Sequence, residues 1–130
     1  VTGMSVFPTL RYADPDAAIA VLRDVFGFTV AAAFRDESGT VQHAELIPDG
    51  GAVLLGSRRE GDRFTTGRAV IYVVVDDVDS HHARAVAAGA TVVQDLVDQP
   101  YGSREYAVVD AEDNIWSFGT YRPGTVHAAT

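Results

Sequence analysis

The sequence contains neither cysteine nor lysine, and these two absences exclude several kinds of chemistry. Without cysteine there is no disulfide, no thiol nucleophile and no thiolate metal ligand. Without lysine no Schiff base can form, and every permanent positive side-chain charge is a guanidinium. The polar groups left for chemistry are four histidines, eighteen acidic residues, ten arginines and the hydroxyl side chains.

Positive charge is also scarce overall, because the 130 residues carry a net charge of −8. Nucleic acids and anionic membrane surfaces both require a basic face, so neither is expected as a partner. No apolar run approaches the roughly 20 residues of a membrane span, and the N-terminus lacks a charged segment followed by an apolar core. We therefore expect a cytoplasmic, unprocessed protein that folds as a single domain over residues 1–130.

The segment Tyr101–Tyr121 predicts two strands joined by a tight polar turn. Residues 103–109 are rich in aromatic and β-branched side chains, residues 110–114 have turn composition, and residues 115–121 are apolar again. A weaker copy of this pattern occurs earlier, at residues 42–57. A fold that is made twice has a boundary between its two copies, which is where we expect the functional site.

The pattern of elements also occurs twice along the chain. The first half predicts a strand, a helix and three strands, at Val6–Tyr12, Pro15–Phe26, Thr29–Arg35, Val41–Ile47 and Ala52–Gly56. A charged, glycine-containing stretch without periodicity follows at residues 58–68. The second half then predicts the same order, with a strand at residues 69–75, a helix capped by Asp76-Asp77 and running to Ala88, and strands at residues 91–96, 103–109 and 115–121.

Residue identities support this repeat. A shift of 63 residues superimposes Asp14 on Asp77, Asp16 on Asp79, Ala44 on Ala107 and Gly56 on Gly119, whereas a shift of 62 superimposes Gly27 on Gly89 and Thr29 on Thr91. The sequence therefore predicts an α+β fold of two βαβββ modules, residues 5–57 and 69–122, with a linker at 58–68 and a tail at 123–130.

Three stretches resemble the vicinal-oxygen-chelate superfamily, which contains glyoxalases, extradiol dioxygenases and bleomycin-resistance proteins. They are DPDAAIAVLRDVFGF at 14–28, VDDVDSHHARAVAAGA at 75–90 and VDAEDNIWSFGTY at 109–121. The resemblance implies two four-stranded mixed β-sheets, each curled and backed by a helix, whose concave faces form a cup. It also implies a homodimer, but it does not identify a function, because this fold supports several chemistries.

The resemblance further implies where metal ligands would lie in the enzymes of this superfamily. One ligand comes from the first strand and one from the last strand of each module. The corresponding residues here are Phe7, Leu54, Val70 and Ser117, and three of them are hydrocarbons. None is a useful ligand for a divalent metal. We therefore expect neither the usual metal centre nor any other cofactor.

Strand alternation extends this face of the cup, because residues two apart on a strand point the same way. If Phe7 faces the cup, then Thr9 and Arg11 do so too. In the second module, if Val70 faces the cup, then Tyr72 faces it too.

On the third strand of each module, Ala44 and Leu46 suit the helix side, which leaves His43 and Glu45 facing the cup. The 63-residue shift then predicts that Tyr106 and Arg104 face it as well, while Trp116 belongs to the core. The predicted ligand-binding residues are Phe7, Thr9, Arg11, His43, Glu45, Leu54, Val70, Tyr72, Tyr101, Arg104, Tyr106 and Ser117. Apolar walls with a few convergent polar groups are typical of a small-molecule site.

Each polar candidate also has a structural interpretation. His43 and Glu45, the catalytic candidates, would serve as metal ligands, as an acid–base pair or as a hydrogen-bonded structural pair. Arg104 would clamp an anionic ligand or pair with a neighbouring acid, and the same alternatives apply to Arg11. The tyrosines would stack on a ligand or pack in the sheet. Tyr101 would close over the cup or belong to a plain connecting loop.

The leading functional hypothesis is a small-molecule binding protein without the superfamily's usual metal centre, which sequesters a drug or metabolite. The alternative is a metal-dependent lyase, isomerase or dioxygenase with a relocated centre at His43 and Glu45, joined by Glu105 only if its strand carries a bulge. An acid–base enzyme without metal and a dimerisation module without ligand are two further alternatives. Whether any reaction is catalysed, and the charge of the ligand, stay open at this point.

Overall fold

The computed structural model describes residues 6–124 and contains two copies of a βαβββ module. The first comprises β1 (Thr9–Tyr12), α1 (Pro15–Asp24), β2 (Thr29–Arg35), β3 (Val41–Ile47) and β4 (Val53–Ser57). The second comprises β5 (Val70–Val74), α2 (Val78–Ala87), β6 (Thr91–Asp98), β7 (Arg104–Val109) and β8 (Ile115–Gly119). The predicted α+β class and the order of elements are confirmed. Residue 5 of the expected first module and residues 125–130 of the expected tail lie outside the described residues.

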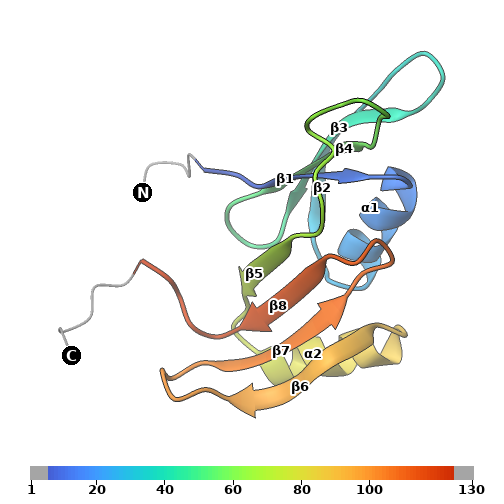
Figure 1. Ribbon diagram of the computed structural model, residues 1–130. Coiled ribbons are helices and arrows are strands. Elements are labelled where there is room, and N and C mark those ends of the chain that lie inside the picture. The colour runs from blue at the N-terminus through green and yellow to red at the C-terminus, as the bar shows by residue number, and fades with distance from the viewer. Residues whose placement is uncertain (1–5, 125–130) are drawn as a thin grey trace.

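Each module forms a four-stranded mixed sheet with its own helix (Figure 1). The strand orders are β1-β4-β3-β2 and β5-β8-β7-β6, so the first and last strands of each module are neighbours, and they pair in parallel. The other pairings are antiparallel. The loop at residues 58–68 connects the two sheets.

Both helices begin at the aspartates that the sequence marks as caps. The Asp14 side chain accepts a hydrogen bond from the Ala17 amide, and Asp77 does the same for Ser80. Gly27 and Gly89 follow the two helices with positive φ angles of 82° and 87°, a conformation that suits glycine. None of the described helices is long and apolar enough to cross a membrane.

The modules pack against each other through aromatic side chains on the helix side of the sheets. Phe26 and Phe28, which follow α1, contact Trp116 on β8, and Phe26 also contacts Phe118. Trp116 is fully buried, as its predicted place in the core requires. Since the helix sides meet in this core, the opposite faces of both sheets remain open to the surroundings.

The registers of the two modules differ by one residue. Leu54 on β4 pairs with Glu45, whereas Ser117 on β8, 63 residues later, pairs with Ala107, 62 residues after Glu45. The helical part of the repeat contains one slip, as the sequence predicts, and the turn before the last strand contains a second one. His43 therefore corresponds to Glu105 and not to Tyr106.

Candidate functional site

On the face of the first sheet that points away from α1, which we call its concave face, two polar side chains contact each other. His43 Nε2 lies 2.8 Å from Glu45 Oε2, and both side chains are half-exposed. Leu54 is the register partner of Glu45 and shares this face with it. The Phe34 ring, on the neighbouring strand, lies 5.8 Å from the His43 ring. The structure thus brings His43, Glu45 and Leu54 together, as predicted.

Arg11 lies at the edge of the same sheet, with its guanidinium close to Gly56 on β4. Its Nη2 is 3.9 Å from Asp62, and its Cζ lies 5.7 Å from the centre of the Phe64 ring. The Arg11 Nε is buried without a hydrogen-bond partner among the described residues. The loop at residues 58–68 thus partly neutralises and covers this arginine. Phe7 and Thr9, which precede it, are exposed.

The second sheet presents Val70, Tyr72 and Ser117 on its concave face, as predicted. Tyr72 and Ser117 are register partners, and Ala107 is the partner of Ser117 on the other side. The Tyr72 hydroxyl donates a 2.6 Å hydrogen bond to the Tyr121 carbonyl oxygen. Burial raises the pKa of Tyr72, so the hydroxyl stays protonated. Val70 is 70% exposed, which is unusual for a valine in a strand.

Arg104 and Tyr106 lie on the opposite, helix-facing side, and their predicted position in the cup is wrong. Tyr106 is fully buried, and its hydroxyl meets the ring of His81 on α2. Arg104 donates hydrogen bonds to Asp79 on α2 and to Asp98 on β6. The physical reason is the second slip in the repeat, which reverses the faces of β7 relative to the 63-residue shift.

Glu105 takes the place that the sequence predicts for Tyr106. Its side chain is 8% exposed, and its two carboxylate oxygens, each 2.9 Å from the Tyr101 hydroxyl oxygen, share the one proton that this hydroxyl donates. Its Cγ lies close to Gly119 and Tyr72 on the concave face. No shift interrupts the β7–β8 pairing, so Glu105 reaches this face without the bulge that the sequence interpretation required. Four apolar residues follow Glu105, so alternation alone could not have revealed its orientation.

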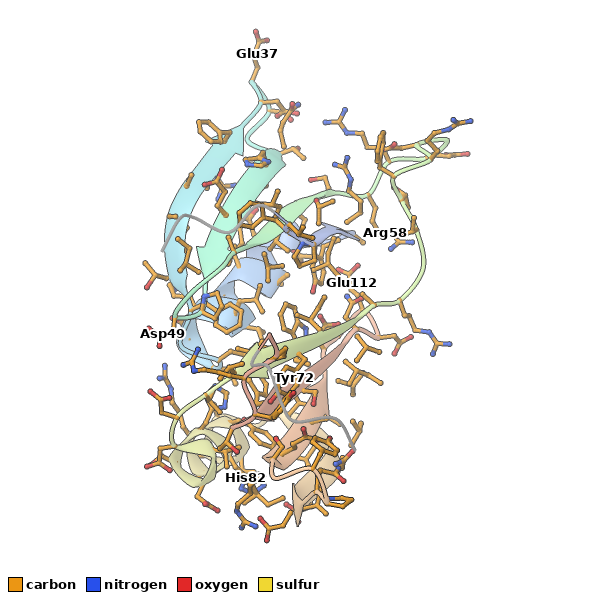
Figure 2. The ribbon with its side chains drawn as sticks, turned by 90° about the vertical axis from the view of Figure 1, so that its left-hand side faces the viewer. Glu37, Asp49, Arg58, Tyr72, His82 and Glu112 are labelled. Carbon is orange, nitrogen blue, oxygen red and sulfur yellow. The ribbon has the colours of Figure 1, made fainter. Side chains whose placement is uncertain are left out.

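A cleft borders this face between the two modules. Its volume is about 480 Å³, and it lies between the turn at residues 48–52, strand β5 and residues 122–123. Apolar groups of Val6, Pro8, Ala52, Ile71 and Tyr72 line it. Figure 2 shows Tyr72 near the middle of the molecule, between the first module and the second. The size lies within the range of small-molecule pockets.

The residues at the superfamily's ligand positions do not fit a divalent metal. Leu54 and Ser117 occupy the two last-strand positions and Val70 the beginning of β5, so together they supply one hydroxyl oxygen. Within residues 6–124, no group of three or more histidine, aspartate or glutamate side chains is arranged to hold a metal ion. His43 and Glu45 provide two donors, which is fewer than the three or four protein ligands of a typical zinc site.

Comparisons with known proteins place this geometry in a family. The model described as Glyoxalase/Bleomycin resistance protein/Dioxygenase superfamily matches residues 6–118. Two uncharacterized proteins, Mb0911c of Mycobacterium bovis and Rv0887c of Mycobacterium tuberculosis, are each 36% identical to the chain over 95 residues. The aligned part is 72% of this chain but 59% and 53% of those proteins, so the chain spans little more than half of their length.

Solved structures of other proteins also resemble this chain. TioX from Micromonospora sp. ML1 is 40% identical, with a TM-score of 0.75 over 90% of this chain and 98% of TioX. TnmS3, an antibiotic binding protein from Streptomyces sp. CB03234, has a TM-score of 0.70 over 91% of this chain and 97% of its own. Its identity of 19% makes that a likeness of fold alone. The chain belongs to the Glyoxalase/Bleomycin resistance protein/Dioxygenase superfamily.

Proposed function

We propose that this protein binds a small molecule at the concave faces of its sheets and sequesters it without the superfamily's usual metal centre. The observation that carries the proposal is the composition of these faces. Hydrocarbons and one hydroxyl occupy the ligand positions, and exposed apolar side chains surround a few polar groups. Such a surface holds a ligand by shape and hydrogen bonds.

The relatives support a binding role. TnmS3 shares the fold and is an antibiotic binding protein, so the same sheets can serve that role in another chain. Fold alone does not determine function, and the argument for this chain therefore rests on its own side chains. An aromatic or otherwise largely apolar compound suits the Tyr72 ring, Val70 and the cleft beside them.

We further propose that the protein acts as a homodimer in which a second copy completes the cup. In the single chain, both concave faces are open, and Val70, Phe34 and Val97 are exposed. Another copy of the chain would cover these apolar groups and enclose the ligand. Stable interfaces of this kind bury about 1,200–2,000 Å².

The binding test uses protein purified without chelator. We expect a thermal-shift screen of aromatic antibiotics and metabolites to find a class that raises the melting temperature by roughly 10 °C at 100 times the Kd. Ser117→Trp places an indole in the middle of the face and should abolish that shift. Val86→Trp, on the exposed side of α2, is the matched control and should keep it. Loss in both variants, or no shift with any compound, contradicts the proposal.

The alternative is a metal-dependent lyase, isomerase or dioxygenase, and the contact between His43 and Glu45 is the observation that favours it. The metal content of the same preparation, measured by mass spectrometry, distinguishes the binding protein from the metal-dependent enzyme. About one equivalent of a divalent metal, lost in His43→Ala while the fold survives, would replace the binding proposal with the metalloenzyme. Activity without metal that depends on His43 would instead establish acid–base catalysis.

A further inference from the structure

Glu105 is a buried carboxylate without a cationic partner. It is 8% exposed, and it forms no ion pair with any arginine or histidine of residues 6–124. Other acids of the second module, such as Asp79 and Asp98, do pair with an arginine. A buried carboxylate is costly unless a partner compensates its charge.

The groups that cover Glu105 are neutral. The Tyr101 hydroxyl lies 2.9 Å from each carboxylate oxygen, and the Gln99 amide donates at 3.4 Å. The hydrogen bond to Glu105 raises the pKa of Tyr101, which keeps this hydroxyl a donor. Tyr101 itself is 57% exposed and lies in the turn between β6 and β7. The exposed Tyr101 side chain thus covers both carboxylate oxygens with the help of Gln99.

The floor around Glu105 suits a flat or slender ligand group. Its neighbours on the same face, Ser117 on β8 and Ala107 on β7, have small side chains. The space above Gly119, the register partner of Glu105, is filled by the Tyr72 and Glu105 side chains themselves. Val97, the register partner of Glu105 on β6, and the Tyr72 ring add apolar surface. The Tyr72 hydroxyl is engaged with the Tyr121 carbonyl, so Tyr72 offers mainly its ring. Aromatic faces attract cations as well as apolar groups.

The arginines that the sequence places in the cup do not oppose a cationic ligand. Arg104 lies on the helix side and pairs with Asp79 and Asp98. Arg11 lies in the first module, near Asp62 and the Phe64 ring. The net charge of −8 also attracts cations over a longer range.

We propose that Glu105 recognises a cationic nitrogen group, an ammonium or amidinium, on the ligand. When this group binds, the Tyr101 hydroxyl gives up its hydrogen bond to one or both carboxylate oxygens, which then accept from the ligand. A two-pronged amidinium matches the two carboxylate oxygens, as the guanidinium of arginine does. The proposal rests on the proposed function and names the ligand class for that same site. Tyr101 then packs its ring against the bound group.

The test compares three probes of similar shape that carry a positive charge, no charge and a negative charge, namely biphenyl-4-carboxamidine, biphenyl-4-carboxamide and biphenyl-4-carboxylate. Binding is measured by NMR titration of the ¹⁵N-labelled full chain. We expect the amidine to bind at least tenfold more tightly than the amide, and the carboxylate most weakly. In Glu105→Gln, which keeps the shape of the side chain and an oxygen acceptor, the amidine should bind no more tightly than the amide.

The control is Glu37→Gln, which makes the same change of charge in the β2–β3 turn, at the opposite end of the molecule from the second sheet (Figure 2). It should keep the preference for the amidine. Tyr101→Phe removes the competing hydroxyl and keeps the ring, so the amidine should bind about threefold more tightly to it. A purely structural role of Tyr101 would lower the melting temperature and leave the affinities unchanged.

Equal binding of the three probes at the concave face would overturn the assignment of Glu105 and leave the proposed function standing. A preference for the amidine that survives in Glu105→Gln would overturn it in the same way. Absence of any perturbation on the concave face, together with a negative thermal-shift screen, would contradict both proposals.

Discussion

At the scale of single residues, Gly119 allows side chains to cross the concave face at close range. A Cβ atom at this position would lie 2.7 Å from the Tyr72 hydroxyl oxygen and 2.9 Å from Glu105 Cγ. We expect Gly119→Ala to lower the free energy of unfolding by about 1–3 kcal/mol, because both neighbours must move. Urea unfolding measures this change.

The control is Gly67→Ala, where an added Cβ meets nothing within 4 Å and φ is not positive. There the loss of backbone freedom in the unfolded chain should leave stability unchanged or raise it slightly. Equal effects of the two substitutions would show that the close approach at Gly119 does not matter.

A second prediction concerns His81, which links the two modules. Its Nε2 lies 3.1 Å from the Phe26 carbonyl oxygen, and its Nδ1 faces the Tyr106 hydroxyl. Burial lowers the pKa of His81, and the charge of Arg84 adds to this effect. The unfolded chain therefore binds a proton more readily than the folded one, so stability should fall as the pH drops below about 6.5.

Urea unfolding between pH 8 and pH 5 measures this dependence. His81→Gln, whose amide supplies a donor and an acceptor without titrating, should show a smaller fall over the same range. An equal fall in both proteins would mean that other groups cause it. Acidic residues whose pKa is lowered by an arginine, such as Asp16, Asp24 and Asp79, lose their contribution only at lower pH.

At the scale of elements, the sequence predicts the order of strands and helices well because periodicity and capping residues are local signals. It does not predict the face of β7. Residues 106–109 of that strand are all apolar, so the sequence does not show which side chains of β7 face the helix. Their orientation could be inferred only from the alignment of the two modules. The identity of Ala44 and Ala107 favours a 63-residue shift, but the pairing of β7 with β8 requires 62. A difference of one residue in a turn reversed Arg104, Glu105 and Tyr106.

The turn between β7 and β8, at residues 110–114, also binds the second module to the first. Asp110 Oδ2 accepts a 2.6 Å hydrogen bond from the Tyr12 hydroxyl on β1 and a 3.0 Å bond from the Trp116 indole. We expect Tyr12→Phe to lower the free energy of unfolding by about 1–3 kcal/mol, because a hydrogen bond to a charged acceptor is lost. Fluorescence of Trp116, the only tryptophan, follows the unfolding.

A double-mutant cycle with Asp110→Asn isolates this contact. If Tyr12 acts through Asp110, the loss on Tyr12→Phe should be smaller in the Asp110→Asn background. Strictly additive effects would show that the Tyr12 hydroxyl stabilises the protein in some other way.

At the scale of the whole molecule, the arrangement of the modules decides what the site can be. Their aromatic core joins the helix sides, which directs the concave faces away from the interior. His43 and Glu45 then lie on one sheet, and Glu105 lies on the other, where Tyr101 of the β6–β7 turn covers it. Sequence alternation predicts most of these faces, but the openness of the cup depends on how two sheets pack, which no local pattern records.

This openness leads to a prediction about assembly. We expect native mass spectrometry and light scattering at micromolar concentration to give twice the 13.9 kDa mass of the chain. Val70 is 70% exposed on the concave face, so Val70→Glu should shift the equilibrium toward monomer by placing a charge where the second copy packs. Val86→Glu introduces the same charge at a 49% exposed position on α2 and should leave the dimer intact. A monomeric wild-type protein, or equal dissociation in both variants, would mean that the cup is not completed by a second copy.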